Sequence, residues 1–139
     1  MKKYIFFLVS IFIILSCNGN KENIPQPTGS IVGEWVLSSY STKSVSIGTE
    51  SIDIYIKFDK SSFEMYQKLG AGRYTYYSGT YTLSKDILSG KYSDGKSWAS
   101  QYSVSLDNKK LTLTQYPDPK EIQTFTSTTI PESVKNNIY

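Results

Sequence analysis

Apolar and polar side chains alternate with a period of two through most of the chain from residue 31 onward, and this pattern restricts the fold more than any other feature. The segment Ile52–Phe58 alternates Ile and Phe with Asp, Tyr and Lys, and Trp98–Leu106 and Leu111–Thr114 show the same spacing. Successive side chains of a strand point to opposite faces of a sheet, so the alternation predicts strands with one buried face. No long stretch of helical periodicity accompanies it, and we therefore expect an all-β fold.

Clusters of Gly, Pro, Asn, Asp, Ser and Lys separate the alternating segments and are typical of turns. They divide the chain into about eight predicted strands, at residues 32–40, 52–58, 62–69, 73–83, 87–92, 98–106, 110–116 and 121–128. Short strands at this spacing predict a small antiparallel meander barrel or a sandwich, and barrel closure removes the exposed sheet edges that promote aggregation. After the last strand, Pro131 predicts a short C-terminal helix, because proline favours the first helical turn.

The N-terminal segment follows a different pattern. Lys2 and Lys3 precede an apolar run at residues 4–15. This run is shorter than the roughly 20 residues that a membrane-spanning helix needs, and a basic start followed by a short apolar run is typical of a signal peptide. We therefore interpret residues 1–16 as a signal peptide, residues 17–30 as a flexible polar tether and residues 31–139 as the folded domain.

Residues 14–17, Ile-Leu-Ser-Cys, resemble the lipobox of bacterial lipoproteins. The resemblance implies cleavage before Cys17 and attachment of diacylglycerol and further fatty acyl chains, such as palmitate, to this residue. Several acyl chains together hold a protein stably on a membrane. We therefore expect a lipid anchor in the bacterial cell envelope, with the domain on the periplasmic face of the outer membrane or on the cell surface.

The composition of the chain after cleavage excludes several classes of function. Removal of Lys2 and Lys3 lowers the basic residues from 15 to 13 against 12 acidic ones, a net charge of +1, which does not predict nucleic-acid binding. The chain has no His and a single Cys, which excludes a Ser-His-Asp triad, a Cys-His pair and a histidine-based zinc site. We expect neither catalysis nor a cofactor or metal.

Four motifs carry a family resemblance. The domain opens with Gly33-Glu34-Trp35, continues with the hairpin Phe58–Phe63 and a Gly-Thr-Tyr strand at residues 79–81, and ends with the hairpin Leu106–Leu111. In this order, behind a lipobox, the motifs resemble the small lipocalin-like lipoproteins of Bacteroidetes-type bacteria over about residues 31–134. The resemblance implies an eight-stranded barrel, whose interior is either filled by side chains or holds one small ligand.

Particular aromatic residues and one glycine are candidates for structural or ligand-binding roles. Gly33 and Trp35 are expected to be structural, with the ring of Trp35 plugging the closed end of the barrel. Trp98, Tyr81 and Tyr102 are the candidates for contact with a ligand, and burial in the core is the alternative for each of them. The longest connection, residues 42–50, corresponds to the lid of lipocalins or else to an ordinary loop tip.

Two functions remain open at this point. The domain binds a small apolar or amphipathic ligand inside the barrel, or it is an accessory module with a filled barrel whose outer face binds a protein or a glycan of the envelope. The volume of the interior distinguishes the two, because a ligand site requires an internal cavity.

Overall fold

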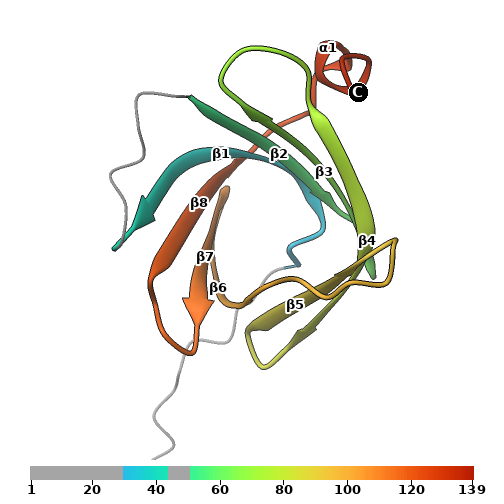
Figure 1. The fold of residues 1–139 in the computed structure, drawn as a ribbon. Coiled ribbons are helices and arrows are strands. Elements are labelled where there is room, and N and C mark those ends of the chain that lie inside the picture. Colours follow the sequence, from blue (N-terminus) through green and yellow to red (C-terminus); the bar gives the residue numbers. More distant parts are fainter. Residues whose placement is uncertain (1–29, 44–50) are drawn as a thin grey trace, which may run out of the picture.

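The computed structural model describes residues 30–43 and 51–139, and within these ranges eight antiparallel strands form a closed barrel (Figure 1). Each strand pairs with the next one along the chain, and β8 returns to pair with β1. The predicted all-β meander barrel is therefore confirmed. The elements are β1 Gly33–Thr42, β2 Ile52–Phe58, β3 Ser62–Leu69, β4 Thr75–Ser84, β5 Ile87–Tyr92, β6 Gln101–Asp107, β7 Lys110–Tyr116, β8 Glu121–Ser127 and α1 Glu132–Lys135.

Several predicted features lie outside the described residues. They are the signal peptide, Cys17, almost all of the tether and residues 44–50 of the connection that was compared with a lipocalin lid. In the ranges that the structure does describe, no helix has the length and apolar character needed to cross a membrane.

The meander divides the barrel into two ends. The hairpins β2–β3, β4–β5 and β6–β7 meet at one end, which we call the closed end, and the remaining connections between strands meet at the other, which we call the open end. Buried aromatic and aliphatic side chains fill the interior near the closed end, namely Trp35, Phe58, Phe63, Tyr81, Leu88 and Leu111. The hydrophobic core that holds the barrel together therefore lies mainly in this half.

The C-terminal segment packs on the outside of the barrel wall (Figure 1). Ile130 and Val134 join Tyr66 and Tyr74 in a second buried cluster, which lies against the outer face of β3. The backbone N–H of Ile130 donates a hydrogen bond of 2.7 Å to the Glu34 carboxylate on β1. The predicted short helix is present at Glu132–Lys135, directly after Pro131, and it closes this outer cluster.

The largest difference from the predicted strands is at the start of β6. The alternation predicts a strand over residues 98–106, but β6 begins at Gln101. The β5–β6 ladder pairs Ile87 with Ser103 and Leu88 with Tyr102, whereas the β2–β3 ladder is continuous from Ile52–Leu69 to Phe58–Phe63. Residues 93–100 connect the two strands at the open end, where an isolated antiparallel bridge between Ser97 and Lys91 continues the pairing with β5. The barrel wall is therefore open between this bridge and the β5–β6 ladder.

Candidate functional site

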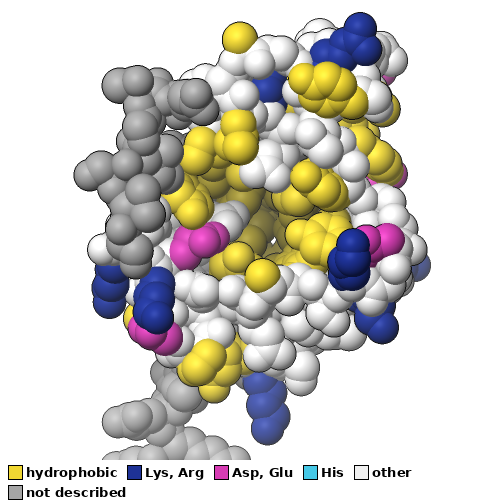
Figure 2. Space-filling view, viewed as in Figure 1, with side chains coloured by type: hydrophobic (Ala, Val, Ile, Leu, Met, Phe, Trp, Pro, Cys, Tyr) yellow, Lys and Arg dark blue, Asp and Glu magenta, His cyan; other side chains and the backbone are white. Residues whose placement is uncertain are grey.

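The interior of the barrel contains a cavity of about 190 Å³ at the open end. Figure 2 shows a hollow whose walls are mostly hydrophobic side chains. Inward-facing residues of β2, β3, β5, β6, β7 and β8 form most of the lining, and the β5–β6 connection completes it. The lining consists of Ile54, Ile56, Met65, Gln67, Tyr92, Trp98, Ala99, Tyr102, Leu113, Gln123 and Phe125. The barrel is therefore filled at one end and hollow at the other.

Trp98 lines this cavity from the connection between β5 and β6 rather than from a strand. Its backbone N–H donates a 2.9 Å hydrogen bond to the carbonyl of Gly90, and its ring lies across that glycine. A methyl group at Gly90 would lie 2.2 Å from a ring carbon of Trp98, so only glycine leaves room for the indole here. The ring also meets Phe63 edge to face, with 5.0 Å between the ring centroids.

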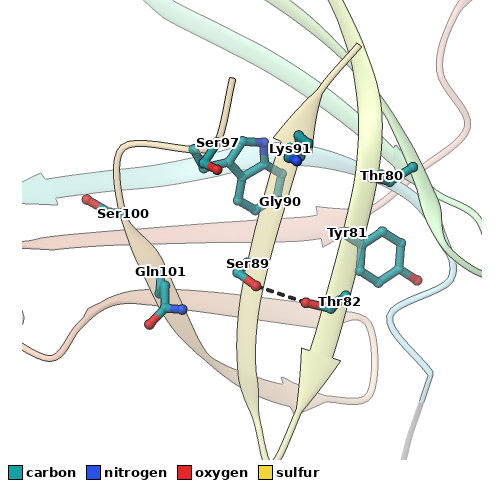
Figure 3. Close-up of a pocket in the computed structure, with 10 residues that line it drawn as sticks. Thr80, Tyr81, Thr82, Ser89, Gly90, Lys91, Ser97, Ser100 and Gln101 are labelled. Atoms are coloured by element: carbon teal, nitrogen blue, oxygen red, sulfur yellow. Dashed lines mark hydrogen bonds between the residues drawn. The ribbon is translucent and has the colours of Figure 1, made fainter. Parts of the chain in front are cut away.

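A polar groove of about 490 Å³, which we call the outer groove, lies on the other side of Trp98. Figure 3 shows Ser97, Ser100 and Gln101 along one side of it and Ser89 with Thr82 along the other. The hydroxyls of Thr82 and Ser89 lie 2.9 Å apart and share a hydrogen bond. Trp98 contributes to the linings of both the groove and the internal cavity, so its indole forms part of the barrel wall where the β5–β6 ladder is open.

The structure brings together two of the three candidate ligand residues. The rings of Trp98 and Tyr102 lie 6.4 Å apart in an edge-to-face arrangement, and both line the cavity. Tyr81 lies apart from them in the closed half, where it packs edge to face on Phe58 with 5.1 Å between the centroids. Its hydroxyl donates a hydrogen bond to the backbone carbonyl of Asp59 at 2.5 Å. Tyr81 lines the outer groove but not the cavity.

Gly33 and Trp35 lie at the closed end, away from the cavity lining. The Trp35 side chain is 5% exposed, and its indole N–H donates a 2.9 Å hydrogen bond to the carbonyl of Ile31. Gly33 has a φ of +148°, a backbone conformation that other residues rarely adopt, and the indole lies 3.7 Å from the position of a Cβ. The environment of both residues is that of core packing.

A small polar network lies at the mouth of the cavity. The Tyr102 hydroxyl donates a hydrogen bond of 3.3 Å to Glu121 Oε1, and Gln123 Nε2 donates to the same oxygen. Burial raises the pKa of Tyr102 well above its usual range, and the Glu121 charge raises it further. Burial and the same carboxylate also raise the pKa of Tyr40. These phenols therefore keep their protons at neutral pH, and the mouth presents neutral hydroxyls beside one carboxylate.

The polar residues of this network, Glu121 and Gln123, were not among the predicted site residues. Glu121, Gln123 and Phe125 occupy alternate positions of β8, and Phe125 is almost fully buried. The alternation could have assigned all three to the inward face, because side chains two residues apart on a strand point the same way. Among the described residues, no group of three His, Cys, Asp or Glu side chains is arranged to hold a metal ion.

Comparison with known proteins agrees with this architecture. Residues 31–113 match the model of the lipocalin-like domain family, and the chain belongs to that family. The lipocalin-like fold implies small-ligand binding in general and is typically non-catalytic. No curated protein sequence matches the chain.

Two solved structures are similar to the chain. The crystal structure of an uncharacterized protein from Bacteroides eggerthii is 20% identical, with a TM-score of 0.52, and the match covers 70% of this chain and 98% of that one. At this level of identity, the similarity shows a shared fold alone. Human cRBP IV is 13% identical with a TM-score of 0.43, over 72% of this chain and 99% of that one.

Proposed function

We propose that the domain binds a small amphipathic molecule whose apolar part enters the cavity at the open end. The observation that carries this proposal is the cavity of about 190 Å³ among apolar and aromatic side chains. Apolar protein cavities of about 150 Å³ hold one benzene ring, whereas pockets for drug-sized ligands measure about 300–1,000 Å³. The buried part of the ligand is therefore limited to one ring or a short alkyl chain.

A second depression continues from the mouth of the cavity and offers space for the rest of such a molecule. It measures about 530 Å³ and shares Gln67 and Tyr92 with the cavity. Tyr77, Asp94 and Lys96 also line it, so its surface combines aromatic rings with charged groups. An apolar cavity that leads into a polar depression suits a ligand with one apolar and one polar end.

The outer groove supports a second candidate function, recognition of an envelope glycan on the outside of the barrel. Its lining consists largely of hydroxyl and amide side chains with one cation, Lys91, and the indole of Trp98. Hydroxyls and amides both donate and accept hydrogen bonds, and this chemistry suits a polyhydroxylated ligand. Binding in the internal cavity is the first proposal, because the lipocalin-like fold supports it independently.

We also propose that the protein is a lipoprotein of the bacterial outer membrane, anchored through Cys17. The lipobox-like residues 14–17 behind a short apolar run support this proposal. Metabolic labelling of cells with a fatty acid tests it, since the Cys17→Ala variant should lose the label that the unaltered protein carries. Equal labelling of the two proteins would contradict the anchor.

Titration with a neutral fluorescent probe such as N-phenyl-1-naphthylamine tests ligand binding, since its single phenyl ring fits the cavity while the naphthyl group remains at the mouth. The protein used is the chain from residue 17 onward, with Cys17→Ser to keep it unlipidated. Trp98→Ala should weaken probe binding by about tenfold, a free-energy change of about 1.4 kcal/mol, because the cavity loses one wall. Ala99→Phe should weaken it as well, because the new ring fills the cavity without emptying the core.

Ile122→Ala is the matched control, because this side chain lies on the outer face of β8, is 40% exposed and lines neither the cavity nor the depression. It should leave the affinity for the probe unchanged. If the unaltered domain takes up no apolar probe, or if Ala99→Phe binds it as well as the unaltered domain does, the cavity is not a ligand site.

A further inference from the structure

The polar side chains at the mouth of the cavity are arranged by the pairing of β8 with β1. Glu121 pairs with Thr42, Gln123 with Tyr40 and Phe125 with Leu37. Phe125 is 1% exposed in the core, so Glu121 and Gln123 share its inward-facing side of the strand. Glu121 is the first residue of β8, and its carboxylate therefore lies at the open end, where it accepts hydrogen bonds from the cavity-lining residues Tyr102 and Gln123.

The hydrogen bonds of this network leave acceptors, rather than donors, available to a ligand. Tyr102 has a single hydroxyl hydrogen, which it donates to Glu121. Gln123 uses one of its two N–H groups on the same carboxylate oxygen, which leaves its amide oxygen and one N–H. An ionised carboxylate only accepts hydrogen bonds. The acceptor lone pairs of Tyr102, Gln123 and Glu121 therefore outnumber the one donor that remains in these three side chains, the second N–H of Gln123.

The ion pairs near the mouth do not include this carboxylate. Lys120 precedes Glu121 in the sequence, but its Nζ lies 3.1 Å from Asp118. Lys96, in the depression outside the cavity, lies 3.0 Å from Asp94. Among the ion pairs of the described residues, none includes Glu121. A ligand that carries its own cation would therefore supply the missing opposite charge.

We propose that the open-end cavity selects amphipathic molecules with a hydrogen-bond-donating head, primary alkylammonium ions above all, and discriminates against carboxylates. This inference rests on the proposed function and specifies the ligand class for the same site. The short alkyl chain lies against Ile54, Leu113 and Phe125, and the head donates to Glu121, Gln123 and Tyr102. A carboxylate head would face the Glu121 charge and the acceptor lone pairs of its neighbours, and like charges at close range repel.

Three ligands with the same eight-carbon chain test the inference by displacement of the neutral naphthyl probe at pH 7. Octylamine is then a cation, octanol is neutral and octanoate is an anion. We expect octylamine to bind at least tenfold more tightly than octanoate, with octanol between them. Glu121→Gln keeps the size and an acceptor oxygen but removes the charge, and it should reduce the tenfold ratio to less than threefold.

Asp107→Asn is the matched control, because it removes one negative charge at the β6–β7 hairpin, at the closed end and outside the network. It should leave the ratio of the two affinities as in the unaltered protein. Octanoate binding as tightly as octylamine, or an unchanged amine preference in Glu121→Gln, would overturn the head-group inference while ligand binding itself stands. Failure of all three molecules and of the probe to bind would overturn the proposed function instead. The order of the three affinities in the unaltered protein tests the inference even if Glu121→Gln folds poorly.

Discussion

The two ends of the barrel are built from the same eight strands, yet one is packed solid and the other encloses a cavity. At the closed end, Trp35, Phe58, Phe63 and Leu111 are buried and fill the interior. At the open end, the strands carry Gln67, Gln123 and Tyr102 inward, and about 190 Å³ remains unfilled. A filled and a hollow barrel, which the sequence offers as alternatives, are therefore combined in one domain. The closed half supplies stability, and the open half can specialise in binding.

The two tryptophans illustrate this division. Trp35 belongs to a strand, is 5% exposed and has its indole N–H satisfied by a backbone carbonyl. Trp98 belongs to a connection, is half-buried and depends on a glycine for its place. A tryptophan held by a strand contributes to the core, whereas one held by a connection can form a wall between two spaces.

The largest expected effect follows from emptying the closed end. Trp35→Ala should lower the free energy of unfolding by about 3–5 kcal/mol, the usual cost of removing a buried aromatic ring. Trp98→Ala should lower it by less, because a half-buried ring loses fewer contacts. Urea denaturation of the two variants beside the unaltered protein measures the difference. An equal decrease in the free energy of unfolding for both substitutions would mean that the open end is as tightly packed as the closed end.

A smaller effect is expected where the two ends meet, at the contact of Gly90 with Trp98. Gly90→Ala should destabilise the domain by about 1–3 kcal/mol, the typical cost of overpacking, because its new methyl group overlaps a rigid indole. It should also weaken binding of the naphthyl probe. The double variant with Trp98→Ala provides the control, since the clash cannot occur when the ring is absent. The double variant should therefore lower the free energy of unfolding by less than the sum of the two single changes. If the two changes were strictly additive, this contact would not be the cause of the destabilisation.

The alternation predicted the strands well because burial on one face is a local property of each segment. It placed the start of one strand too early, at residue 98, because Trp98, Ser100 and Tyr102 continue to alternate although β6 begins at Gln101 and only an isolated bridge at Ser97 precedes it. Alternation reports which side chains face the core, not which backbone groups are paired. Trp98 keeps its inward orientation from the connection, so the pattern persists without a strand.

The candidate site was harder to predict for a related reason. Alternation assigns a residue to the inner or outer face, but its height along the barrel depends on the register between strands. Tyr81 and Tyr102 both face inward, yet Tyr81 lies beside Phe58 at the closed end and Tyr102 lies at the cavity. The inward Glu121 was missed because a charged residue in a strand is usually assigned to solvent.

The smallest expected effect tests the separation of Tyr81 from the binding end. Tyr81→Phe keeps the ring against Phe58 but removes the hydroxyl that bonds to the Asp59 carbonyl. A single hydrogen bond of this kind contributes about 0.5–1.5 kcal/mol, so the free energy of unfolding should fall by about 1 kcal/mol. Probe affinity should stay the same, because Tyr81 does not line the cavity. Tyr102→Phe is the matched change at the open end and should alter the affinity for octanol, because it removes an acceptor at the mouth. If Tyr81→Phe changed ligand affinity as much as Tyr102→Phe does, the two ends of the barrel would not have separate roles in core packing and in ligand binding.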